Sequence, residues 1–230
     1  MATALWTPLT SGIRASIYNP GGPDGATCDL ATLTPIALAT QIFLDNFTGT
    51  NGADLVAHTD DTGIGLWEHE LAGDLVLLDG SVVNAVASTP TTYTSATVSL
   101  PGDYESTLQA DFAAFDTTDF TVTVEARGFT NTLSIVISCV AEVITASASI
   151  AGYQNNETAT ITVPYCTWSS LIAYWNPETG TLRITLGAAT AEVVLGGSDS
   201  IDLTRMAVSI NNATANAARI AAVSFSTIPF

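Results

Sequence analysis

The sequence predicts an all-β fold, an antiparallel β-sandwich preceded by an irregular N-terminal arm. Three observations predict it: stretches in which apolar and polar residues alternate, glycine, proline and asparagine between those stretches, and weak helical periodicity throughout. A chain of 230 residues has the length of one large β domain, which buries roughly 70% of its unfolded surface. Three cysteines are an odd number, which argues against a disulfide framework.

The first 40 residues differ from the rest of the chain. Four prolines and the turn-forming stretch at residues 19–25 exclude a long helix or a central strand there. The same segment carries many apolar side chains, among them Leu5, Trp6, Leu9, Ile13, Ile17 and Tyr18. Two interpretations remain open. The segment wraps around its own domain, or it is an arm that anchors the protein by burying these groups in a neighbouring subunit.

From residue 41 to the end, alternating patterns predict half-buried antiparallel strands. Residues 120–124 and 133–139 place large apolar side chains on one face and threonine or serine on most of the other. Residues 158–163 and 182–186 repeat the pattern. Many short strands with almost no helix predict two antiparallel sheets packed face to face.

Two further stretches of this region have a predicted conformation. Residues 174–186 indicate strand, tight turn, strand, with Pro177 and Gly180 supplying the turn dihedral angles. Residues 211–222 are the best candidate for a helix, and the alternative is a loop that leads into a last strand.

The stretch at residues 43–67 holds a more specific pattern. It contains an Asp-x-Phe strand at Asp45 and Phe47, a Thr-Gly-Thr-x-Gly turn, a Leu-x-x-His step that ends at His58, and an Asp-x-Gly stretch that leads to Trp67. This pattern resembles the opening of the concanavalin A-like lectin (laminin G-like) jelly-roll domains of bacteriophage virion proteins.

Two later segments fit the same resemblance. Residues 73–80 resemble the short strand and turn that follow the tryptophan in such domains, and residues 219–228 resemble the closing strand. The resemblance spans residues 41–230 and leaves residues 1–40 outside it. It implies that the first and last strands are neighbours, with Phe47 and Phe225 on one buried face and Trp67 as a plug at the end of the sandwich.

The resemblance also implies a function. The protein is expected to be a non-enzymatic structural protein of a phage particle, displayed on the capsid or the tail and fixed by its N-terminal arm. Its partners would be other virion proteins and further copies of the chain, a trimer being one such homo-oligomer. It would be made in the host cytoplasm and located in the virion.

The charge of the chain excludes several partners. Twenty-two acidic and five basic residues give a net charge of −17, and all the basic residues are arginines. Such a chain repels nucleic acid and anionic membrane surfaces. The longest uncharged stretch, residues 80–102, is broken by Pro90 and Pro101, so we expect no membrane insertion. The first residues lack the basic start and the continuous apolar run of a signal peptide.

No catalytic set is expected. Glycosidases that resemble this fold carry Glu-x-Asp-x-Glu on one strand, so that one acid donates a proton and another attacks. Residues 68–70 and 103–105 each supply only two acids. The two histidines, His58 and His69, lie in neither a zinc motif nor a triad-like context.

One cation site is a candidate. Asp60 and Asp61, close to His58 in a turn, offer the oxygen ligands that Ca²⁺ prefers. Ca²⁺ is therefore the one cofactor that the sequence suggests. The alternative interpretation is that both aspartates are solvated turn residues.

Carbohydrate binding is the alternative function. It requires an exposed aromatic ring beside polar groups. Two clusters at predicted loop borders meet this requirement in sequence, Tyr174, Trp175 and Asn176 in one and Tyr165 and Trp168 in the other. Their alternative role is packing beneath the loops. If the rings are exposed, the expected ligand is a host surface glycan.

Overall fold

The computed structural model describes residues 7–8, 13–14, 39–63, 65–70, 74–95, 104–114, 118–152, 157–163, 168–196 and 200–229. The chain divides into two compact units, residues 1–38 and 39–230. In the first unit, β1 (Thr7–Pro8) pairs antiparallel with β2 (Ile13–Arg14). Of the predicted arm residues, Ile13 lies in β2, and the others lie outside the described residues: Leu5, Trp6, Leu9, Ile17 and Tyr18. The anchoring role of the arm stays a prediction.

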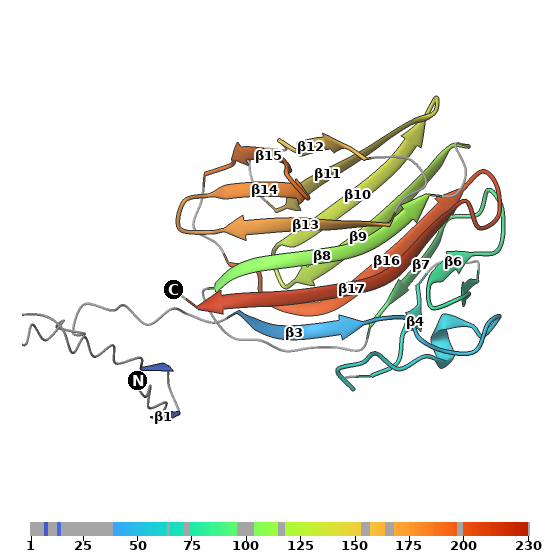
Figure 1. Cartoon of the computed structure of the whole chain (residues 1–230), viewed down its shortest axis with the longest axis horizontal. Helices are drawn as coiled ribbons and strands as arrows, with labels where there is room; N and C mark the ends of the chain where they lie inside the picture. Colours follow the sequence, from blue (N-terminus) through green and yellow to red (C-terminus); the bar gives the residue numbers. More distant parts are fainter. Residues whose placement is uncertain are drawn as a thin grey trace, which may run out of the picture. The chain divides into compact units, whose positions relative to one another are not determined.

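The second unit is a sandwich of two antiparallel sheets that lie face to face (Figure 1). The seven-stranded sheet has the order β12-β11-β10-β9-β16-β7-β4. Its strands are β4 (Glu68–His69), β7 (Thr91–Thr94), β9 (Phe120–Gly128), β10 (Thr132–Val140), β11 (Val143–Ala151), β12 (Ala159–Thr162) and β16 (Leu203–Asn212).

The eight-stranded sheet has the order β15-β14-β13-β8-β17-β6-β5, with β3 also paired to β17. Its strands are β3 (Thr40–Asp45), β5 (Leu75–Leu77), β6 (Val82–Asn84), β8 (Tyr104–Ala114), β13 (Ser169–Asn176), β14 (Thr181–Leu186), β15 (Ala189–Val194) and β17 (Ala218–Pro229). A single 3-10 turn, η2 (Leu55–Ala57), lies between β3 and β4 in the part of the chain that is described. The predicted all-β sandwich is confirmed.

The first and last strands of the sandwich are neighbours, as the resemblance implies. In the pairing of β3 with β17, Asp45 lies opposite Val223 and Phe43 opposite Phe225. Phe47 is the second residue after β3 and is fully buried, like Phe225. Both rings belong to one hydrophobic core, so the predicted burial of Phe47 and Phe225 together is confirmed.

Alternation along the strands builds this core. On β9, Val122 and Val124 face inward and pair with Ile137 and Ile135 of β10, and all four side chains are fully buried. Charged side chains on these strands lie on the outer face, because successive residues of a strand point to opposite sides. The predicted strands at residues 120–124 and 133–139 are therefore confirmed, and each extends further than the pattern predicts.

The structure tests the two predictions for the stretches at residues 174–186 and 211–222. Residues 177–180 form a turn between β13 and β14, with Gly180 at φ +64°, as predicted. Residues 211–222 form no helix; they contain the end of β16, a turn and the start of β17, which is the loop-and-strand alternative. Among the described residues, no helix is long and apolar enough to cross a membrane.

Candidate functional site

The opening motif forms a buried polar network. Asp45 is fully buried, and its Oδ2 accepts a 2.6 Å hydrogen bond from Trp67 Nε1. Its Oδ1 accepts from the backbone N–H of Phe47 at 2.7 Å and lies 2.8 Å from His58 Nε2. Burial raises the pKa of Asp45 above 3.8, and the hydrogen bonds from His58 and Trp67 oppose that rise. Because the ring of Trp67 also packs against Phe43 and Phe47, with centroids 5.9 and 5.8 Å apart, the predicted role of Trp67 as a core plug is confirmed.

The predicted cation ligands are engaged elsewhere. Oδ2 of Asp61 accepts hydrogen bonds from the backbone N–H and the side-chain amide of Asn46, both at 2.8 Å. Asp60 is buried; its carboxylate accepts from the Gly65 N–H at 2.9 Å and from the Thr62 hydroxyl. Within the described ranges, no three His, Cys, Asp or Glu side chains gather as ligands. The described geometry therefore gives no support to Ca²⁺ at Asp60 and Asp61.

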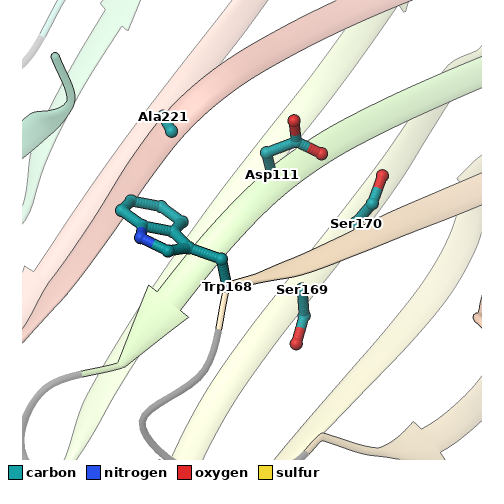
Figure 2. Close-up of a pocket in the computed structure, with 5 residues that line it drawn as sticks. All are labelled: Asp111, Trp168, Ser169, Ser170 and Ala221. Carbon is teal, nitrogen blue, oxygen red and sulfur yellow. The ribbon is translucent and has the colours of Figure 1, made fainter.

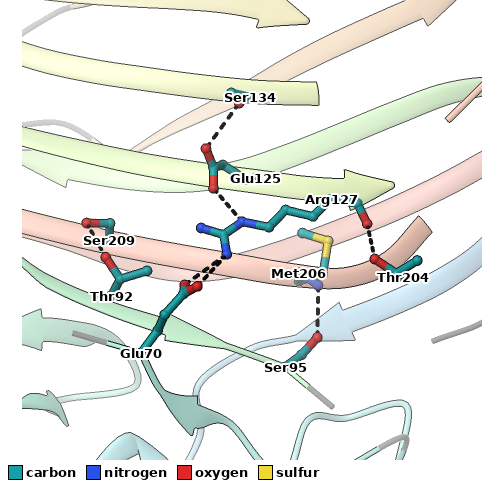
Figure 3. Close-up of polar contacts among 9 residues, drawn as sticks. All are labelled: Glu70, Thr92, Ser95, Glu125, Arg127, Ser134, Thr204, Met206 and Ser209. Carbon is teal, nitrogen blue, oxygen red and sulfur yellow. Dashed lines mark hydrogen bonds and ion pairs between the residues drawn. The ribbon is translucent and has the colours of Figure 1, made fainter. Parts of the chain in front are cut away.

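The acidic residues at positions 68–70 do not form a row of carboxylates on one strand. The carboxylate of Glu70, just after β4, accepts hydrogen bonds from Arg127 Nη1 at 2.8 and 3.2 Å (Figure 3). Arg127 Nε donates to Glu125 at 2.8 Å, and Ser134 donates to the other oxygen of Glu125 at 3.4 Å. Partial burial lowers the pKa of Arg127, but the hydrogen bonds to Glu70 and Glu125 raise it above its usual value. This network links β9, β10 and the end of β4 on the outer face of the seven-stranded sheet.

The predicted aromatic residues have different positions. Trp175 is fully buried among the inward-facing residues of β13, so its side chain cannot contact a glycan. Assigning Trp175 to an exposed platform was therefore wrong. Tyr165 lies outside the described residues. Trp168 is 52% exposed, which satisfies the requirement for an accessible ring.

Tyr174 and Asn176 lie on the outer face of the eight-stranded sheet, near the end of β13. Asn176 Nδ2 donates to the Tyr174 hydroxyl at 3.2 Å and to Glu105 at 2.8 Å. The guanidinium of Arg183 lies 4.7 Å from the centroid of the Tyr174 ring. Partial burial and the hydrogen bond with Glu105 raise the pKa of Tyr174. Tyr174 and Asn176 therefore contact each other and the charged side chains of Glu105 and Arg183.

Trp168 borders a shallow pocket on the outer face of the same sheet. The pocket has a volume of about 410 Å³ and is lined by Asp111, Trp168, Ser169, Ser170 and Ala221; we call it the Trp168 pocket. In Figure 2 the indole of Trp168 extends toward Ala221 of β17, while Asp111 of β8 and Ser170 of β13 project from the neighbouring strands. Ser169 points the other way, into the sandwich.

Strand pairing and a bulge build this pocket. Asp111 lies opposite Ser170 on one side and Ala222 on the other. The register of β17 shifts between Ile220 and Ala222, which places the small side chain of Ala221 at the pocket. Such bulges redirect side chains and occur often beside functional sites.

The polar groups of the pocket are coupled through Gln109. Its amide Nε2 donates to the Ser170 hydroxyl oxygen at 2.9 Å and to Asp111 Oδ1 at 3.3 Å. Asp111 can accept a further hydrogen bond at Oδ2, and Ser170 can donate one through its hydroxyl. An aromatic ring, a carboxylate and a hydroxyl thus line one accessible hollow, and the Gln109 amide links the last two. Of these residues the sequence predicts Trp168 alone as a candidate. The alternation at residues 108–112 is typical of a strand, but it does not single out the remaining four, which are Gln109, Asp111, Ser170 and Ala221.

Comparisons with known proteins identify the fold. No protein-family model matches the chain, and a search of curated proteins finds no match. Among solved structures, the CBM2 module of the Lactobacillus casei BL23 phage J-1 evolved Dit is similar, with a TM-score of 0.61 at 8% identity over 84% of this chain and 98% of that one.

Two carbohydrate-related domains are similar as well. The potassium-bound carbohydrate recognition domain of Emp46p has a TM-score of 0.54 at 14% identity, over 76% of this chain and 95% of that one. The exoplasmic/lumenal domain of VIP36 in its Ca²⁺/Man3GlcNAc-bound form has a TM-score of 0.51 at 11% identity, over 71% and 84% of the two chains. The β-sandwich of residues 39–230 therefore has the concanavalin A-like lectin jelly-roll fold that the pattern at residues 43–67 predicts.

Proposed function

We propose that the β-sandwich binds carbohydrate at the Trp168 pocket, as a non-enzymatic component of a phage particle. The observation that carries this proposal is the position of Trp168, half exposed at the edge of a hollow that Asp111 and Ser170 also line. Gln109 donates hydrogen bonds to both of these polar residues. Covering an aromatic ring that is this exposed removes apolar surface from water, which favours binding. The groups beside it are those that a sugar requires.

The chemistry of the pocket matches the two kinds of surface on a sugar. The C–H face of a pyranose ring packs on an indole, which removes apolar area of both from water. Sugar hydroxyls donate to the Asp111 carboxylate and exchange hydrogen bonds with Ser170 and Gln109. Because the pocket is shallow, it suits one or a few units of a longer glycan exposed on a surface. A host surface glycan is therefore the proposed ligand.

The similar solved domains support the same class of ligand. The Emp46p domain is named a carbohydrate recognition domain, and the VIP36 domain was solved with Man3GlcNAc. The similarity to a module of a phage Dit protein supports a place in a phage particle.

The proposal is tested by replacing Trp168. The Trp168→Ala variant should keep its fold, because the side chain is half exposed, and lose binding on an array of bacterial surface glycans. Phe129→Ala is the matched control, since Phe129 is 86% exposed in the turn between β9 and β10, away from the pocket. Array binding that survives Trp168→Ala, or no binding by the unaltered protein, would overturn the proposal.

A structural role in the particle is a second candidate, and the division of the chain favours it. Residues 1–38 form a unit of their own before the sandwich begins. We propose that this unit anchors the protein to other virion proteins, on the capsid or the tail, and that the chain acts there as a homo-oligomer. A variant without residues 1–38 should fold and fail to join particles. Normal incorporation of this variant would contradict the anchor.

A further inference from the structure

We infer that the Trp168 pocket selects a sugar that carries a positively charged amino group. This inference rests on the proposed function and specifies its ligand. It follows from three features of the described residues. These are the charge of Asp111, the indole beside it, and a second place on the same sheet face where a cation lies between an aromatic ring and a carboxylate.

Asp111 is a carboxylate without a cationic partner among the described residues. Its one described hydrogen bond comes from Gln109, a neutral amide. The described arginine ion pairs of Arg127, Arg183 and Arg219 all involve other carboxylates. The chain has no lysine and a net charge of −17, so the field around the pocket repels anions and attracts cations.

The indole gives the pocket a second attraction for a cation. The face of a tryptophan ring carries negative partial charge and is the best aromatic partner for an ammonium group. Because the Trp168 ring and the Asp111 carboxylate line one hollow, an ammonium group there meets both at once. Its hydrogen bond to the carboxylate is charge-assisted and therefore stronger than that of a sugar hydroxyl. The Ser170 hydroxyl is left for a hydroxyl of the same sugar.

The protein already contains this combination on the same face of the sheet. The Arg183 guanidinium lies over the Tyr174 ring at 4.7 Å from its centroid, with the Glu192 carboxylate 4.0 Å away. There, the protein supplies the ring, the cation and the carboxylate. At the Trp168 pocket it supplies the ring and the carboxylate, and the ligand supplies the cation.

The test compares three oligosaccharides of equal length and linkage, made of glucosamine, N-acetylglucosamine or glucose. Titration calorimetry of the full chain at low salt should give about tenfold tighter binding of the glucosamine oligomer, the size of one cation–π contact combined with an ion pair. Added salt should reduce this preference, because it screens the charge of Asp111. An anionic galacturonic acid oligomer should bind more weakly than the glucose oligomer.

Two variants separate the pocket from the overall charge. Asp111→Asn keeps the shape of the side chain and should abolish the preference for glucosamine while leaving binding of the glucose oligomer. Glu105→Gln, which removes one charge from the same face of β8 at its other end, should keep the preference.

The outcomes distinguish the two proposals. Equal binding of all three oligomers, lost in Trp168→Ala, would overturn the charge selection and leave the proposed function standing. A preference that persists in Asp111→Asn would overturn the assignment to Asp111. A lysine derivative without a sugar ring that binds as tightly as the glucosamine oligomer would contradict a sugar ligand. No binding of any glycan would overturn the proposed function itself.

Discussion

The indole of Trp67 donates a 2.6 Å hydrogen bond to the carboxylate of Asp45, and both side chains are shielded from solvent. A buried carboxylate is costly unless donors surround it. Trp67, His58 and the N–H of Phe47 are those donors. The residues that make the pattern at positions 43–67 recognisable therefore stabilise the core, and the proposed glycan site lies in another part of the sandwich.

Replacing Trp67 by phenylalanine should destabilise the protein by about 3 kcal/mol, because it leaves Asp45 Oδ2 unpaired and opens a cavity in the core. Trp168→Phe is the matched control. The same change at a half-exposed ring should cost no more than about 0.5 kcal/mol. Urea unfolding of the two variants measures both free energies, and equal losses would contradict the role of Trp67.

The pH dependence of stability should report on Asp45. Burial raises the pKa of this carboxyl above 3.8, so the folded protein holds the proton more tightly than the unfolded chain. The stabilising contribution of this group is therefore fully present below the unfolded pKa and is lost as the pH rises through the folded pKa. Asp45→Asn removes the titration. The unfolding free energy of the wild type minus that of the variant should fall as the pH rises across that window. A rise of this quantity with pH would show that the pKa of Asp45 is lowered instead.

Gly180 should be irreplaceable in the turn between β13 and β14. It has φ +64°, and a Cβ placed there would lie 2.7 Å from the backbone of Gly196. Gly187, in the next turn, has φ +56° and open space around it. Gly180→Ala should therefore destabilise the protein well beyond the cost of about 1 kcal/mol that we expect for Gly187→Ala from backbone strain alone. Thermal unfolding of both variants would reveal the difference, and equal melting temperatures would contradict it.

Glu70→Gln should have a small effect. The ion pair with Arg127 is partly exposed, and such pairs contribute about 0.5 kcal/mol. Glycan binding should not change, since Glu70 lies by the seven-stranded sheet and the Trp168 pocket lies on the other one.

A glycan hydrolase assay on the unaltered protein should give no turnover. Turnover that disappears in Glu70→Gln would contradict a non-enzymatic function.

The sequence was sufficient to predict the strands whose inward residues are large. Val122, Val124, Ile135 and Ile137 stand out against threonine and serine, so β9 and β10 are recognisable. In β11 the inward positions include Ala146 and Ala148, whose sequence neighbours are threonine and serine, which gives little contrast in hydrophobicity. Such a strand is defined by its pairing with β10, a tertiary contact that the local pattern does not contain.

The candidate site could be predicted only in part. Alternation from Leu171 through Ala173 places Trp175 in the core, and applying this parity to β13 would have corrected the prediction for Trp175. Asp111 and Ser170 come together only because β8 pairs with β13 in one register. Ala221 reaches the pocket through a bulge in β17. Registers and bulges between distant segments follow from the packing of the whole sandwich, so these residues were not accessible from local sequence.

Glycan binding at the Trp168 pocket can be observed directly in an NMR titration that follows the indole N–H signals. We predict that a glycan identified on the array, or the glucosamine oligomer, shifts the signal of Trp168 with a saturating dependence on concentration. The signals of Trp67 and Trp175, which are buried in the core, should stay in place. Saturable glycan binding that leaves the Trp168 signal unmoved would show that the glycan does not bind at the Trp168 pocket.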